Sequence, residues 1–287
     1  MPIKAVPMRT GFFDAAARAE GQLTPDEATV HVRDANALCA SDTVHPQLDF
    51  GRFRLWPKLT AALRNLAGEL AAHGVPEEFE QRPWAQACEE GALLFLRSVL
   101  LDQHHMLGVP ANDAWPDELS DRCCERFGEA YASFAHTDLR VAGQCVYNIW
   151  VPVANVESEH LLLFAANAEV DAAVEFRAAR NKAHHLPMAC AELGEWYYFP
   201  GLTVGDALIF PGDGGGHKPD SRGIFHCSEW ASAGTRQSFD VRELLVPHGP
   251  RTSEACAAEA VSRARDRLRR EVAEWEARLA GLHGEAR

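Results

Sequence analysis

His136 and Asp138 lie two residues apart in the stretch AHTDLR, residues 135–140. On an extended segment the side-chain period is two, so both side chains point to the same face. A facial iron site takes two histidines and one carboxylate on one side of the metal and leaves positions open for oxygen and substrate. The pair alone is weak evidence, because a chain with 13 His and 41 acidic residues contains such pairs by chance.

A second histidine ligand would have to come from later in the chain. His226 lies in the apolar run RGIFHCS, residues 222–228, so a rigid strand would hold it. His217 follows the glycine-rich stretch GDGGG and stays a rival ligand. The other later histidines are His160, His184, His185 and His248.

A candidate carboxylate-binding strand begins ten residues after His226. One face of this strand is entirely polar, with Arg236, Ser238, Asp240 and Arg242 alternating with Gln237, Phe239, Val241 and Glu243. Such a face is costly in a core unless it lines a wet pocket or meets partners. An arginine beside a serine hydroxyl suits a carboxylate, because the guanidinium forks onto both oxygens and the hydroxyl adds a donor. The alternative is a structural ion pair of Arg236 with Asp240 or Glu243.

Length, charge and cysteine usage exclude several classes of protein. A chain of 287 residues fits one large domain or two small ones. The net charge of −13 without a long basic run argues against nucleic-acid and membrane partners. Eight scattered cysteines, no CxxC pair and no apolar segment of signal-peptide length at the start favour a cytoplasmic protein with reduced thiols. We expect a small molecule as its partner.

Helical patterns come first in the chain, and strand patterns follow. Residues 57–74 have helical apolar spacing with a proline at the start and a glycine at the end, and further helices are predicted within 77–106 and over 116–131. From 133 onward, short runs rich in β-branched and aromatic residues alternate with turn residues: 145–153, 160–165, 195–200, 206–211, 222–228 and 236–246. This order predicts helices packed on one face of an antiparallel β core.

The tail over 253–283 has apolar residues at mostly four–three spacing among Glu and Arg. It predicts an amphipathic helix, either docked on its own domain or forming a homodimer with a second copy. We therefore expect one domain over 1–250, helical or irregular over 1–132 with the β core at 133–246, followed by a C-terminal helix in 251–287.

Five elements occur in a fixed order along the chain: HTD at 136–138, NIWVPV at 148–153, GDALIFPG at 205–212, His226, and RQSFDVR at 236–242. This ordered set resembles the non-haem iron(II), 2-oxoglutarate-dependent oxygenases of the phytanoyl-CoA-hydroxylase-like superfamily. Within it, the set is similar to the small bacterial hydroxylases of streptomycin-type and other secondary-metabolite pathways. The resemblance covers about residues 133–246 and none of the first 130.

The resemblance implies an α+β fold with a mainly β core, a double-stranded β-helix of the jelly-roll type. It implies that His136, Asp138 and His226 bind Fe(II). Arg236 would pair with the distal carboxylate of 2-oxoglutarate, with Ser238 assisting and Asn148 helping to hold this cosubstrate. O2 would take the coordination position of the iron that the protein ligands and 2-oxoglutarate leave open.

The resemblance also bears on the reaction. Related halogenases have a small residue where this chain has Asp138, so the aspartate favours hydroxylation, or desaturation or cyclisation, of a small polar metabolite.

Gly205 and Asp206 are typical of a turn. The charged, glycine-rich segment at 212–223 is longer than the usual link and suits a mobile flap. Two other classes stay open: a cupin-type metal enzyme without 2-oxoglutarate, and a non-catalytic β-sandwich binding protein.

Overall fold

The computed structural model describes residues 3–9, 29–38, 42, 50–74, 82–103, 145–166, 194–211, 225–229, 236–245 and 254–285. These residues form strands, three α-helices and one 3-10 helix. The strands are β1 (Ile3–Arg9), β2 (Thr29–Asp34), β3 (Gly51–Arg54), β4 (Cys145–Pro152), β5 (Leu161–Ala166), β6 (Gly194–Tyr198), β7 (Asp206–Pro211), β8 (Phe225–Glu229) and β9 (Ser238–Leu245). The helices are η1 (Ala35–Ala37), α2 (Pro57–His73), α3 (Pro83–Gln103) and α7 (Glu254–Glu285).

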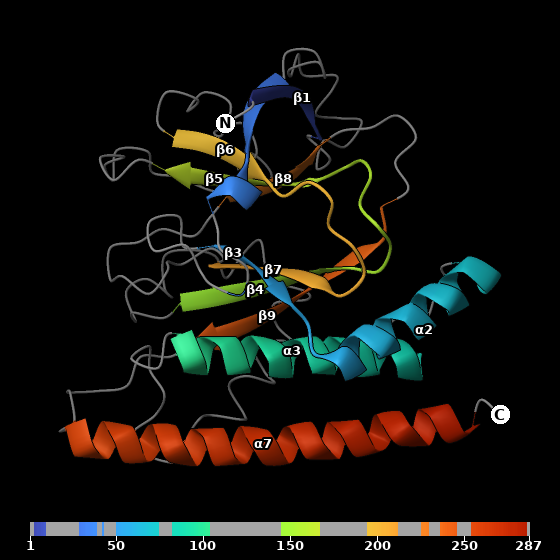
Figure 1. The fold of residues 1–287 in the computed structure, drawn as a ribbon, viewed down its shortest axis with the longest axis vertical. Helices are drawn as coiled ribbons and strands as arrows, with labels where there is room; N and C mark the ends of the chain where they lie inside the picture. Colours follow the sequence, from blue (N-terminus) through green and yellow to red (C-terminus); the bar gives the residue numbers. More distant parts are fainter. Residues whose placement is uncertain are drawn as a thin grey trace, which may run out of the picture.

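The strands form two sheets that face each other (Figure 1). One sheet has four antiparallel strands in the order β3-β7-β4-β9, and we call it the helix-backed sheet. The other five strands close on themselves in the order β1-β2-β6-β5-β8, because β1 pairs with both β2 and β8. Only β2 and β6 pair in parallel within this second group, which we call the barrel sheet. Figure 1 shows α2 and α3 under the helix-backed sheet and α7 beneath them.

The chain crosses repeatedly between the two sheets. From β4 in the helix-backed sheet it passes to β5 and β6 in the barrel sheet, returns to β7, crosses to β8 and ends in β9. Crossing of this kind is the connectivity of a double-sheet jelly roll. All six strands predicted from 133 onward are present, with ends shifted by a few residues, and the predicted packing of helices on one face of the β core is confirmed.

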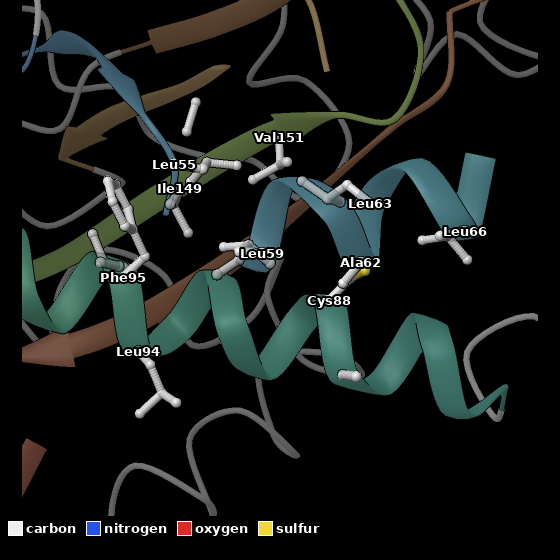
Figure 2. Close-up of a cluster of buried hydrophobic side chains, with 14 of the residues drawn as sticks. Leu55, Leu59, Ala62, Leu63, Leu66, Cys88, Leu94, Phe95, Ile149 and Val151 are labelled. Carbon is white, nitrogen blue, oxygen red and sulfur yellow. The ribbon is translucent and has the colours of Figure 1, made fainter. Parts of the chain in front are cut away.

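The predicted helix at 57–74 is α2, which begins at Pro57 and ends before Gly74, whose φ of 72° lies in the left-handed region that glycine adopts readily. The helix predicted within 77–106 is α3, and the one predicted at 116–131 lies outside the described residues. Figure 2 shows Leu59 and Cys88 between α2 and α3. Burial, then the charges of Glu89 and Glu69, raise the pKa of the Cys88 thiol to about 12, so this thiol stays protonated and inert. Among the described helices, none has the length and hydropathy needed to span a bilayer.

The predicted tail helix is α7, and it packs on α3. Trp275 is fully buried there, and its indole Nε1 donates to the main-chain oxygen of Ala87 at 2.8 Å. Gly91 of α3 leaves the space for this ring, because a Cβ at position 91 would collide with it. The prediction that this helix docks on its own domain is confirmed, and the homodimer stays a prediction.

Candidate functional site

Strand β4 separates two environments, because its side chains alternate between the faces of the helix-backed sheet. Tyr147, Ile149 and Val151 belong to the apolar cluster shared with α2, α3 and α7, which we call the helical core. Trp150 belongs to a second cluster between the two sheets, which we call the inter-sheet cluster. The other members of the inter-sheet cluster come from several strands and turns: Ala35, Phe50, Val156, Leu161, Leu163, Tyr197, Phe199, Leu202, Leu208 and Phe210.

Asn148 is the polar residue of β4 on the face that carries Trp150. Its side chain is fully buried, and neither its nitrogen nor its oxygen has a hydrogen-bond partner among the residues that the structure describes. An unsatisfied buried amide costs about 1–3 kcal/mol, so native proteins almost always pair such groups with protein, water or ligand. A partner of the Asn148 amide would have to come from outside the described residues, from water or from a bound molecule.

Strand β9 adds polar positions to the same face. Ser238 lies opposite Pro152, and Asp240 lies opposite Trp150, so their side chains share the face of Trp150 and Asn148. Phe239 and the next apolar residue, Val241, pack on the other side against the helical core. The sequence prediction that one face of this strand is polar and the other apolar is confirmed, and the polar face is the one that looks toward the barrel sheet.

Arg236 lies just before β9 and covers Trp150. The Cζ atom of its guanidinium is 5.6 Å from the centroid of the Trp150 ring, a cation–π geometry. Its Nη1 donates to the main-chain oxygen of Glu159, and its main-chain N–H donates to the Glu159 carboxylate at 3.3 Å. The charge of Arg236 is therefore held at the end of β4, beside the residues of the polar face.

A second buried pair lies next to this contact. His160 Nδ1 is 2.6 Å from a carboxylate oxygen of Glu229, and the other oxygen accepts from Lys4 Nζ at 3.0 Å. The His160 ring also meets the Tyr198 ring edge-on at 5.2 Å between centroids. Burial works to raise the pKa of the Glu229 carboxyl, but the hydrogen bonds and positive charges of His160 and Lys4 outweigh it, and the pKa is lowered. Glu229 is thus held ionised at neutral pH.

The predicted iron ligands are tested only in part. His226 lies in β8, as predicted, opposite Leu163 of the inter-sheet cluster, and its side chain lies outside what the structure describes. His136 and Asp138 lie outside the described residues, and the described residues contain no cluster of three potential metal ligands. The rival His217, the 212–223 segment and three further histidines, His184, His185 and His248, also lie outside them.

The predicted cosubstrate residues stay a prediction. Asn148 and Ser238 lie on the Trp150 face of the helix-backed sheet, four register positions apart, and Arg236 contacts Trp150. His160, considered as a metal ligand from its type alone, is bonded to Glu229. Glu159, the residue that holds Arg236, was missed, because SEH at 158–160 shows no pattern that would link it to residues far along the chain.

Gly205 and Asp206 form a turn, as predicted. Gly205 has a φ of 107°, and the Asp206 carboxylate accepts from the main-chain N–H of Thr203 at 2.7 Å. The fully buried Asp206 also pairs with Arg52 at 3.1 Å and Arg54 at 2.9 Å. These bonds fix β3 against β7, so Asp206 has a structural role.

Comparisons with known proteins give distant structural neighbours. No family model and no curated protein matches the chain. Among solved structures, the chain is similar to the iron and alpha-ketoglutarate-dependent endoperoxidase NvfI in a different conformation, at 13% identity, TM-score 0.41, over 76% of this chain and 85% of that one. Two further NvfI structures, one a single-residue variant, give 13% and 10% identity and TM-scores of 0.39 and 0.36, over 76% of this chain and 86% of theirs. At this level of similarity the fold and the site rest on this chain's own contacts.

Proposed function

We propose that this chain is an Fe(II)- and 2-oxoglutarate-dependent oxygenase that hydroxylates a small polar metabolite, with O2 as co-reactant. The observation that carries the proposal is the guanidinium of Arg236 over the Trp150 ring. The same sheet face carries Asn148, a buried amide with no hydrogen-bond partner among the described residues. An apolar pocket with a few convergent polar groups is the usual form of a small-molecule site. The groups that converge here are the ones that a dicarboxylate requires.

The described residues fit 2-oxoglutarate. A guanidinium binds a carboxylate through two parallel hydrogen bonds, and the half-buried Ser238 adds a hydroxyl donor from the neighbouring strand. The Asn148 amide can donate to a ligand oxygen or accept from a bound water. In this proposal Arg236 and Ser238 hold the distal carboxylate, and Asn148 gains hydrogen bonds that the described residues do not supply.

The metal part of the proposal rests on position in the chain. His226 is carried by β8, next to β5 in the barrel sheet, where a rigid strand would fix a ligand. The proposed site is completed by His136 and Asp138, which the resemblance assigns to the metal. When bound, iron with 2-oxoglutarate and O2 supplies an oxidant that removes hydrogen from the substrate. The chain's own part is to orient the cosubstrate through Arg236 and to exclude water with the inter-sheet cluster.

The type of reaction is inferred from Asp138. A carboxylate ligand there favours hydroxylation, with desaturation or cyclisation as the other outcomes of the same oxidant. The fold of the proposed enzyme is a double-stranded β-helix, supported by the crossing of the chain between the two sheets. We place the substrate in secondary metabolism, on the resemblance to the streptomycin-type branch.

The proposal is tested by anaerobic loading with Fe(II) and 2-oxoglutarate. The expected result is a weak visible charge-transfer band of the chelated keto acid, and its titration gives the dissociation constant. Arg236→Ala should raise that constant at least thirtyfold, or about 2 kcal/mol, since it removes one partner of a buried charged contact. Arg97→Ala is the matched control, because Arg97 pairs with Glu271 in the helical layer. Asp138→Ala and His226→Ala should abolish the band, and His217→Ala should leave it.

Each contrary result would indicate a different kind of protein or a different site residue. Iron binding without a band would indicate a cupin-type metal enzyme that does not use 2-oxoglutarate. A band that Arg236→Ala leaves unchanged would remove Arg236 from the cosubstrate site. Absence of iron binding would indicate a binding protein without metal chemistry. Loss of the band in His217→Ala with retention in His226→Ala would move the second histidine ligand to the 212–223 segment.

A further inference from the structure

Residues 159 and 160 occupy an unusual position between β4 and β5. Glu159 has a φ of 55°, in the left-handed region that non-glycine residues rarely adopt, and it is only 6% exposed. His160 is 7% exposed. A strained backbone and a buried carboxylate each cost free energy, so the surrounding contacts must hold them in place. Such a combination is common where a geometry serves function.

Glu159 holds Arg236 through two groups. Its main-chain oxygen accepts from the guanidinium, and its carboxylate accepts from the Arg236 main-chain N–H at 3.3 Å. The direction of that main-chain oxygen depends on the left-handed backbone of Glu159. The Trp150 ring also lies against the guanidinium, so Arg236 is held by contacts with both Glu159 and Trp150.

His160 ties the same segment to β8. Its main-chain oxygen accepts from the Glu229 N–H at 2.8 Å, and its Nδ1 meets the Glu229 carboxylate at 2.6 Å. Glu229 is the last residue of β8, the strand that carries His226. Two consecutive residues therefore hold the arginine before β9 and the end of the strand with the proposed distal histidine.

We propose that Glu159 is a positioning residue that sets the approach of Arg236 to the 2-oxoglutarate carboxylate, with His160 anchoring it to β8. This inference rests on the proposed function. The separation between Arg236 and β8 is fixed by the Glu159–His160 segment, and a dicarboxylate that spans the arginine and the metal requires a fixed separation. Loss of the Glu159 carboxylate frees the main-chain N–H of Arg236 and shifts the guanidinium relative to the indole, which weakens cosubstrate binding although Glu159 does not touch the cosubstrate.

The experiment measures the 2-oxoglutarate dissociation constant from the anaerobic band, together with the unfolding temperature. Glu159→Gly accepts the left-handed backbone and removes the carboxylate, and we expect a five- to twentyfold rise in the dissociation constant. Glu159→Asn tolerates the same backbone with a side chain too short to reach, and serves if the glycine variant does not fold. Glu159→Gln keeps the acceptor and should stay within twofold of wild type. Glu271→Ala, which breaks contacts with Arg97 and Arg267 in the helical layer, controls for lost stability.

The outcomes separate this inference from the proposed function. If wild-type protein gives no band, the proposed function fails and the inference falls with it. If wild type gives the band and the glycine or asparagine variant binds as tightly or more tightly, the function stands and Glu159 positions nothing. If Glu271→Ala weakens binding as much as Glu159→Gly does, the effect is one of stability and the inference is wrong.

Discussion

The two faces of the helix-backed sheet differ in chemistry although they share the same strands. On the face toward α3, Ile149 and Val151 lie in a cluster of apolar side chains (Figure 2). This cluster reaches α7 through Trp275. On the face toward the barrel sheet, Asn148 is buried without a hydrogen-bond partner among the described residues, and Arg236 covers Trp150. In the function proposed above, stability and chemistry are carried by opposite sides of one strand, so substitutions should separate them.

The largest effect is expected on the helical face. Trp275→Ala removes a fully buried indole and its hydrogen bond to Ala87, and we expect the free energy of unfolding to fall by about 3–5 kcal/mol. Denaturant unfolding measures this loss. The 2-oxoglutarate dissociation constant of the folded fraction should not change. Glu274→Ala, at an exposed position of the same helix, is the control and should stay within about 0.5 kcal/mol. Weaker cosubstrate binding in Trp275→Ala would contradict the expectation that stability and cosubstrate binding depend on different faces of the sheet.

A smaller effect of opposite sign is expected on the inner face. Asn148→Leu replaces an unpartnered buried amide by an apolar group of similar shape, so we expect the free protein to gain about 1–3 kcal/mol of stability. The same change should weaken 2-oxoglutarate binding about tenfold. Asn65→Leu is the matched control, because the Asn65 amide contacts His283 on the outer layer. A loss of stability in Asn148→Leu would show that Asn148 serves the fold and would remove it from the proposed site.

The smallest effect concerns the buried carboxylate that holds β8. The pKa of Glu229 is lower in the folded protein than in the unfolded chain. The ionised carboxylate therefore stabilises the fold fully at pH values above the ordinary pKa range of glutamate. This stabilisation is lost as the pH falls from that range through the lower pKa of the folded state. Glu229→Gln should lower stability at pH 7 by about 1 kcal/mol and flatten the acid limb of the stability curve. Unfolding temperatures between pH 3 and 7 measure this, with the more exposed Glu195→Gln as control. An unchanged acid limb would contradict the assignment.

Much of the fold follows from local patterns that the sequence carries by itself. Pro57 and Gly74 mark the ends of α2 because each has a backbone preference that acts without tertiary contacts. The alternation over Ser238, Phe239, Asp240 and Val241 predicts one polar and one apolar face because a strand's side-chain period is two. The assignment of Arg236, Ser238 and Asn148 to one cosubstrate site rests on a resemblance in the order of short motifs and stays a prediction.

Only the tertiary structure shows which residues from distant parts of the chain contact these side chains. Glu159 meets Arg236 across 77 positions of the chain, and His160 meets Glu229 across 69. No local period links residues so far apart, since their contact depends on how β5 and β8 pair. Burial is likewise a tertiary property, and only packing shows that the Asn148 amide lies in the core with no hydrogen-bond partner among the described residues. Residue types along the chain thus determined which side chains were available, and strand pairing determined which of them face one another.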